Sequence, residues 1–132
     1  MKKQIEQVLE FHKKFNIPFS EKLQSIELTS AVLRINLIEE EAKEVEDALY
    51  HEGAEEVAKE LCDLLYVTYG TIITFGLQDK IEECFDEVHK NNMSKVDETG
   101  KPKYRNDGKL IKPENYKPVN LKNIIYGNLE TN

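Results

Sequence analysis

The chain has 132 residues with a formal net charge of −7, a third of them charged and only four of them proline. This length fits one domain, the composition is typical of an all-α protein, and the acidic balance argues against binding to a nucleic acid polymer. The longest apolar run, residues 64–77, is too short to span a bilayer, and Met1-Lys2-Lys3 is not followed by an apolar signal core. We expect a single domain, residues 1–132, in the cytoplasm and away from membranes.

The first predicted helix covers residues 2–15 and ends near Asn16, because Pro18 disfavours helical backbone at the residue before it. His12 and Phe15 lie near its end with further aromatic rings. These rings either belong to the core or form a wall for a flat nucleobase, with His12 hydrogen-bonding a base edge. Both readings stay open, and both residues are candidate substrate contacts.

Two long helices are predicted next, over about residues 26–50 and 54–75, and Ser20 is a plausible cap for a short segment through Glu27 or for an earlier start. Each long helix has an apolar stripe at helical spacing. The short break at His51-Glu52-Gly53 suggests an antiparallel hairpin in which the two stripes face each other. The stripes are Leu28, Ala31, Ile35, Ile38, Ala42, Val45 and Leu49 in the first, and Val57, Leu61, Leu64, Thr68, Ile72 and Phe75 in the second.

Both helices also have an acidic side. At about 100° per residue, Glu41 and Glu44 lie about 80° and 140° from the centre of their stripe, and Glu60 and Asp63 lie at similar angles in the same sense. Reversal of one helix in the hairpin brings the two pairs to the same side. Four converging carboxylates repel unless they bind a hard divalent cation, so Mg²⁺, or alternatively Mn²⁺, is the expected ligand. The alternative is an ordinary solvated acidic face.

Other positions carry weaker expectations. Arg34 lies two turns before Glu41 and is expected to pair with a cluster carboxylate or to reach a phosphate. Tyr66, Tyr69 and Ile73 lie on the other side of their helix and suggest a subunit contact, hence a homodimer or homotetramer. A further helix is expected over about residues 79–90.

The last third of the chain is basic and irregular. Residues 93–132 carry 8 Lys or Arg against 5 Asp or Glu, a net charge of +3, and residues 1–92 carry 10 against 20, a net charge of −10. Asp107-Gly108 indicates a small hairpin. We expect a helical core of about residues 1–94 and a C-terminal segment of about 95–132, which is either a disordered tail or a segment that docks over a bound ligand.

The stretch Leu37 to Glu44 together with Glu60-Leu61-Cys62-Asp63 resembles the all-α nucleoside triphosphate pyrophosphohydrolases. That superfamily includes MazG-like proteins, dimeric dUTPases, dCTP pyrophosphatases and phosphoribosyl-ATP pyrophosphohydrolase, and its motif is Glu-Glu-x-x-Glu followed by Glu-x-x-Asp. Asn91 to Lys95 and Asp107 to Pro113 look like the phosphate-contacting end of MazG-like and phosphoribosyl-ATP pyrophosphohydrolase-like members. The chain has no Trp for the base-stacking role that some dCTP-specific relatives use.

The resemblance implies a four-helix MazG-like bundle that hydrolyses a nucleoside triphosphate to a monophosphate and pyrophosphate, with Mg²⁺ held by Glu41, Glu44, Glu60 and Asp63. Glu40 would be the catalytic base that orients water. Lys95, Lys109 and Lys112 would bind phosphates, and Asn92 would hydrogen-bond substrate. Phosphoribosyl-ATP hydrolysis in histidine synthesis and a non-catalytic helical adaptor are the alternatives.

Overall fold

The computed structural model describes residues 1–51 and 53–127, and within them the regular structure is helical, which confirms the all-α prediction. The helices are α1 (Lys2–Lys14), α2 (Leu28–His51), α3 (Ala54–Phe75), α4 (Ile81–Met93) and α5 (Lys122–Tyr126). Glu52, part of the predicted break, lies outside the described residues. The chain divides into two compact units, residues 1–79 and 80–132, each of which is described by itself. The prediction of a single domain stays a prediction.

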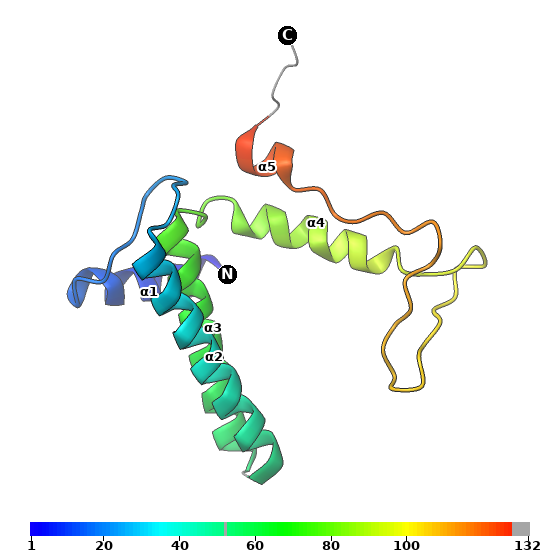
Figure 1. Ribbon diagram of the computed structural model, residues 1–132, viewed down its shortest axis with the longest axis horizontal. Helices are drawn as coiled ribbons and strands as arrows, with labels where there is room; N and C mark the ends of the chain where they lie inside the picture. The colour runs from blue at the N-terminus through cyan, green and yellow to red at the C-terminus, as the bar shows by residue number, and fades with distance from the viewer. Residues whose placement is uncertain (52, 128–132) are drawn as a thin grey trace. The chain divides into compact units, whose positions relative to one another are not determined.

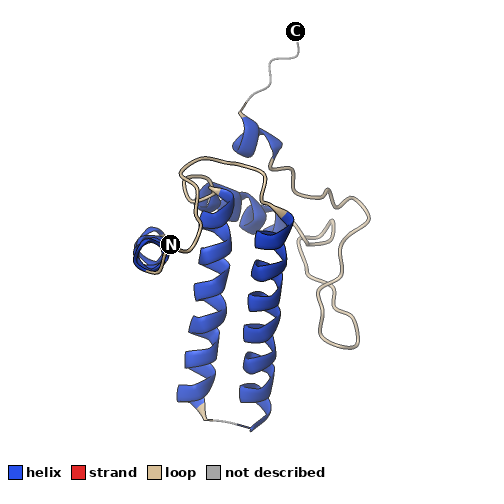
Figure 2. Cartoon of the chain, turned by 60° about the vertical axis from the view of Figure 1, so that its left-hand side comes forward, coloured by secondary structure: helices blue, strands red, loops and turns tan. Residues whose placement is uncertain are grey.

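Helices α2 and α3 form the antiparallel hairpin that the sequence predicts, and they run side by side in both views (Figures 1 and 2). The second helix ends at Phe75 because Gly76 adopts a left-handed conformation, with φ 73°, and its N–H caps the last turn. A Cβ at Gly76 would also overlap the backbone of Lys22. Glycine is therefore required here both by its φ angle and by the close approach of the preceding loop.

The predicted orientation of the two helices in the hairpin is wrong. On α2 the buried residues are Arg34 and Ala48, whereas Leu28, Ile35 and Leu49 are 79%, 54% and 65% exposed. The apolar stripes therefore do not face each other squarely, since one edge of the α2 stripe is exposed and the other, with Ile38 and Val45, is half-buried. The hairpin instead packs through the side of each helix that lies next to the stripe. On α2 this side carries the buried Arg34 and the half-buried Glu41, and on α3 it carries the buried Glu60.

Arg34 is one of these contacts and does not form the expected ion pair. Its Nε donates a hydrogen bond to Thr71 Oγ1 at 3.1 Å, and its Nη2 donates to the Val67 carbonyl at 2.7 Å. Both acceptors lie on α3, so the guanidinium links the two helices. Burial lowers the pKa of Arg34, in keeping with the cost of placing a charge away from water. The Arg34 guanidinium fits against α3 because residue 70 is glycine and has no Cβ.

We expect Gly70→Ala to destabilise the protein, although alanine normally stabilises a helix interior by about 1 kcal/mol relative to glycine. A Cβ built on Gly70 would overlap the Arg34 guanidinium and would lie 3.0 Å from His12 Nε2. We expect a loss of about 1–3 kcal/mol in the free energy of unfolding, measured by urea denaturation. Thr68→Ala, at an exposed site on the same helix, is the control, and a stabilised Gly70→Ala variant would contradict the prediction.

Helix α1 covers the side of α3 that the sequence assigns to a subunit contact. It packs against α3 and crosses the hairpin near the end where α2 begins (Figures 1 and 2). Ile5 and Val8 of α1 are buried, and Ile73 of α3 is fully buried. The assignment of Ile73 to an exposed strip is therefore wrong, because α1 folds back over it.

The segment before α2 is not helical, so the expected cap at Ser20 is wrong. The Ser20 hydroxyl instead bonds to the Lys22 carbonyl at 2.7 Å. The backbone N–H groups of Ser20 and Gln24 donate to the carbonyls of Ile73 and Phe75 at 2.9 and 3.1 Å. These carbonyls lie in the last turn of α3, where no further helical turn supplies donors. The non-helical loop therefore supplies hydrogen-bond donors to these two carbonyls.

In the second unit, α4 runs three residues further than predicted, to Met93. Beyond it, an antiparallel bridge pairs Tyr104 with Leu110 around a turn at Gly108, whose φ is 83°, and this confirms the predicted hairpin. Tyr116 donates to Asn91 Oδ1 at 2.5 Å, and the Asn91 amide donates to the Lys117 carbonyl at 2.7 Å. These bonds fasten the segment to α4.

Candidate active site

The acidic residues of α2 and α3 meet within the hairpin. One carboxylate oxygen from each of Glu41, Glu60 and Asp63 lies within 4.8 Å of the others. Glu60 is 5% exposed, and Glu41 and Asp63 are half-buried. The side of each helix that faces the other therefore carries the charges, and the convergence predicted from the rotation count is present for these three residues.

Two of the oxygens have no hydrogen-bond partner among the described residues. Glu41 Oε2 and Glu60 Oε2 are both buried, and no group in the described residues donates to either of them. A buried carboxylate oxygen without a donor is costly, and such groups in a native protein usually have a metal, a ligand or water as partner. The donor set is oxygen only, which suits a hard divalent cation. The residues present therefore fit a magnesium or manganese ion.

The electrostatics of the cluster reflect this crowding. Burial raises the pKa of Glu41, and the charges of Asp63, Glu40 and Glu60 raise it further. A hydrogen bond with Glu60 raises the pKa of Glu44, which places the fourth predicted ligand against the cluster although it is exposed. The pKa of Glu60 is instead lowered, mainly by a hydrogen bond from Lys59. The repulsion among the carboxylates thus shows as a raised pKa at Glu41 and Glu44.

Glu40, the predicted base, lies beside the cluster on α2. It is exposed to solvent, and its charge is close enough to raise the pKa of Glu41. An exposed carboxylate next to the acidic cluster is accessible to a water molecule. The position is therefore compatible with a role in orienting water.

The predicted phosphate contacts lie in the second unit. Lys95 Nζ bonds to Asn92 Oδ1 at 2.7 Å, and the ammonium groups of Lys95 and Lys112 lie 5.7 and 5.2 Å from the centre of the Tyr116 ring. Two cations thus share one aromatic ring. This brings together Asn92, Lys95 and Lys112 of the predicted set.

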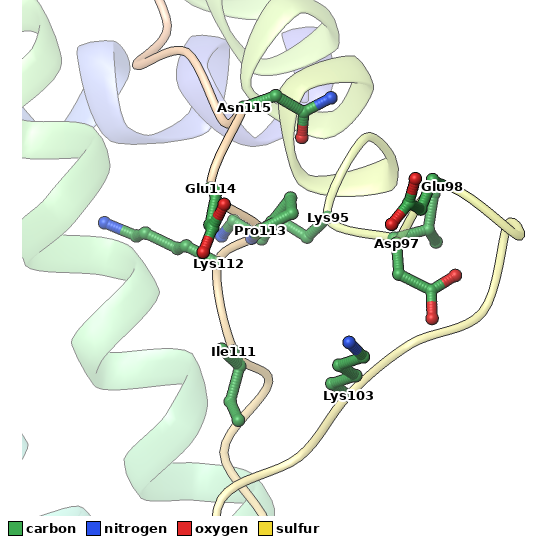
Figure 3. Close-up of a pocket in the computed structure, with 10 residues that line it drawn as sticks. Lys95, Asp97, Glu98, Lys103, Ile111, Lys112, Pro113, Glu114 and Asn115 are labelled. Carbon is green, nitrogen blue, oxygen red and sulfur yellow. The ribbon is translucent and has the colours of Figure 1, made fainter.

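A pocket of about 490 Å³ opens beside these residues (Figure 3). Lys95 and Lys112 line it together with Lys103, whose side chain points toward Asp97 in Figure 3. Lys109 is not among the lining residues and lies on the hairpin, where its backbone N–H bonds to Asp107 Oδ1 at 3.1 Å. Lys103 was missed as a site residue because nothing in the sequence distinguishes it from the other lysines of this segment.

The predicted base contacts differ in accessibility. His12 is 2% exposed, and its Nδ1 lies 3.2 Å from the Pro18 carbonyl. Burial lowers the pKa of His12, which favours the neutral imidazole. Phe15 is 55% exposed and stacks at a tilt on Phe11, with 4.6 Å between the ring centres. Phe15 is therefore accessible to a ligand, and His12 is held in the fold of the first unit.

A family model described as phosphoribosyl-ATP pyrophosphohydrolase matches residues 8–92 of the chain. The chain belongs to this family. The phosphoribosyl-ATP pyrophosphohydrolase family is part of the all-α nucleoside triphosphate pyrophosphohydrolase superfamily, so the resemblance seen in the two acidic motifs is confirmed. The matched residues include the whole acidic cluster. Membership supports a nucleotide pyrophosphohydrolase type of function and leaves the substrate open.

A curated relative, the uncharacterized protein L479 of Acanthamoeba polyphaga mimivirus, is 29% identical to the chain over 117 residues. The alignment covers 83% of this chain and 43% of the relative, so the chain spans less than half of that protein's length. None of the helices in the described residues combines the length and the apolar character that crossing a membrane requires.

Proposed function

We propose that this member of the phosphoribosyl-ATP pyrophosphohydrolase family is a Mg²⁺-dependent nucleoside triphosphate pyrophosphohydrolase. It would convert a (d)NTP and water to a (d)NMP and pyrophosphate, as a cytoplasmic enzyme that removes unwanted nucleotides from the pool. The observation that carries the proposal is the convergence of Glu41, Glu60 and Asp63, with two buried oxygens to which none of the described residues donates a hydrogen bond. A polyphosphate is the natural substrate for such a site, because divalent ions bridge phosphate oxygens.

Glu41, Glu44, Glu60 and Asp63 would hold the ion, and Mn²⁺ could replace Mg²⁺. When bound, the ion would neutralise charge on the phosphate oxygens. Two ligands come from each helix, so the packing of the hairpin sets the size of the site. Glu60 is the most buried of the four, and it is enclosed between the two helices.

Glu40 would act as the base. Its carboxylate would accept a proton from water as the water oxygen forms a bond to the α phosphorus. The bond from the α phosphorus to the bridging oxygen breaks, and that oxygen leaves with pyrophosphate. The exposure of Glu40 and its closeness to Glu41 support this role, because a base must reach water beside the ion.

The basic residues of the second unit would bind the phosphates. Lys95 and Lys112 are the best supported, because both lie at the Tyr116 ring, and Asn92 bonds to Lys95. We assign Lys109 to the same task on its place in the matching sequence segment. Phe15 would stack on the base, and His12 would support the aromatic end of α1.

Incubation with a nucleotide panel and Mg²⁺ tests the proposal directly. We expect release of pyrophosphate and a nucleoside monophosphate, resolved by ³¹P NMR, and no activity in the presence of EDTA. Release of single phosphate, or no turnover of any nucleotide, would contradict it. Glu46→Gln is a suitable control variant, because Glu46 lies on the same helix and pairs with Lys43 outside the cluster.

Phosphoribosyl-ATP is the second candidate substrate, and the family match is the observation that favours it. Including phosphoribosyl-ATP in the panel separates the two by their relative kcat/KM. A non-catalytic helical adaptor is the remaining alternative. It predicts that Mg²⁺ and Mn²⁺ leave the melting temperature unchanged, whereas ion binding raises that temperature.

We also propose that the protein is a homo-oligomer that associates through the apolar stripes of α2 and α3. Leu28, Ile35, Ala42 and Leu49 follow one another at seven-residue spacing on α2 and are exposed, and Leu61 on α3 is 44% exposed. The described residues include five buried apolar side chains, namely those of Ile5, Val8, Ala48, Ile73 and Cys84. Heptad stripes of this kind pack against other helices. A second hairpin would bury them in a four-helix arrangement.

A further inference from the structure

A positive charge already lies against the acidic cluster. Lys59 on α3 places its Nζ 2.7 Å from Glu60 Oε1 and 3.2 Å from Asp63 Oδ2. The ammonium thus bridges the two carboxylates that α3 contributes. The contact with Asp63 follows from the sequence spacing, because side chains four residues apart are neighbours on a helix surface.

The carboxylate oxygens of the cluster fall into two groups. Glu60 Oε1 accepts a hydrogen bond from Lys59, whereas its Oε2 and Glu41 Oε2 are buried and have no hydrogen-bond partner in the part of the chain that the structure describes. A metal ion bound by these inner oxygens would lie next to the Lys59 ammonium. The metal ion and the ammonium would then both interact with Glu60 and Asp63. Like charges so close repel strongly where protein excludes part of the water.

Lys59 can leave the cluster without disturbing the fold. Its side chain is 56% exposed, whereas that of Glu60 is 7% exposed. A lysine ammonium is strongly hydrated and sits on a flexible stem, so movement into water costs little. Glu60 cannot move in the same way because it is enclosed between the helices. Of the two partners, Lys59 is therefore the one whose side chain can move away.

We propose that Lys59 is an internal counter-ion, which neutralises part of the acidic cluster in the metal-free protein and leaves it when a divalent ion binds. This role rests on the metal site of the proposed function. It would limit repulsion among the acids before the ion arrives. It would also weaken metal binding, because the ion must replace an ion pair that already exists.

Lys59→Gln tests this role through metal affinity. The variant keeps a polar side chain of similar length and removes the charge. We expect it to bind Mn²⁺ about fivefold more tightly or better, a typical size for coupling between two sites, when Mn²⁺ is titrated by calorimetry and by EPR of the free ion. We also expect the metal-free variant to melt at a lower temperature than wild type, and the Mn²⁺-saturated proteins to melt together.

Lys43→Gln is the matched control. Lys43 has a similar exposure and pairs with Glu46 and Asp47 at 3.3 and 3.2 Å, away from the cluster. The Lys43→Gln variant should therefore bind Mn²⁺ with the affinity of wild type. Lys59→Arg should return the affinity toward wild type because it restores the charge. Unchanged or weaker Mn²⁺ binding by a folded Lys59→Gln variant would overturn the inference. Absence of Mn²⁺ binding by wild type would instead overturn the metal site itself.

Discussion

Replacing Glu41 with Gln is expected to reduce kcat/KM for the preferred nucleotide by about 10³-fold and to abolish Mn²⁺ binding at micromolar concentrations. Glu41 is the proposed ligand from α2, and one of its carboxylate oxygens lies within 4.8 Å of an oxygen of Glu60 and of Asp63. The amide of Gln keeps the size of the side chain and removes the negative charge. Steady-state kinetics and Mn²⁺ titration measure the two effects.

The same variant should be more stable than wild type when no metal is present, and increasingly so as the pH rises. The pKa of Glu41 is raised in the folded protein, so its contribution to stability is complete below the ordinary pKa of 4.5. That contribution is lost as the pH rises through the raised value and the carboxylate ionises beside Asp63 and Glu60. Gln cannot ionise, so the difference in melting temperature should widen between pH 4 and pH 7.

Saturating Mn²⁺ should reverse the order, because the ion stabilises wild type and not the variant. Glu46→Gln, on the exposed side of α2, should match wild type in activity and in Mn²⁺ affinity. A Glu41→Gln variant that still binds Mn²⁺ like wild type would contradict the assignment of Glu41 as a ligand. Full activity in that variant would remove the basis of the proposed function.

Ile35→Glu is expected to dissociate the oligomer and to lower the free energy of unfolding by at least about 3 kcal/mol. Ile35 lies at the centre of the exposed stripe on α2 and is 54% exposed in the single chain. In an oligomer the new carboxylate would be buried without a partner. Light scattering coupled to gel filtration gives the mass, and urea denaturation gives the stability.

Asn36→Glu provides the control, because it adds the same charge to the next residue of the helix. Asn36 is exposed, and about 100° of rotation separates it from Ile35. It should retain the mass and stability of wild type. A monomeric wild-type protein, or an Ile35→Glu variant with unchanged mass, would show that the stripe does not mediate association.

The positions of Lys59 at the acidic cluster and of Lys103 at the pocket were not predicted from the sequence. Lys59 lies four residues before Asp63, which is a detectable spacing for an ion pair, yet spacing alone does not tell which of several carboxylates a flexible lysine will choose. Lys103 lines the same pocket as Lys95 because of the path of an irregular segment, and no periodic pattern encodes that path. For Lys59 the missing information was the choice among neighbouring carboxylates, and for Lys103 it was the path of the backbone.

The sequence by itself determined the all-α class, the hairpin of two long helices, the end of α3 at Gly76 and the grouping of acidic residues on one side of each long helix. These features depend on local periodicity and on the fixed rotation of a helix, which are properties of neighbouring residues. Tertiary structure alone decided which side of each helix faces the other. Arg34 fits against Gly70 and bonds to α3, and α1 covers Ile73, so the apolar stripes are left exposed. Periodicity shows that a stripe will be buried, but the partner that buries it depends on contacts between distant residues.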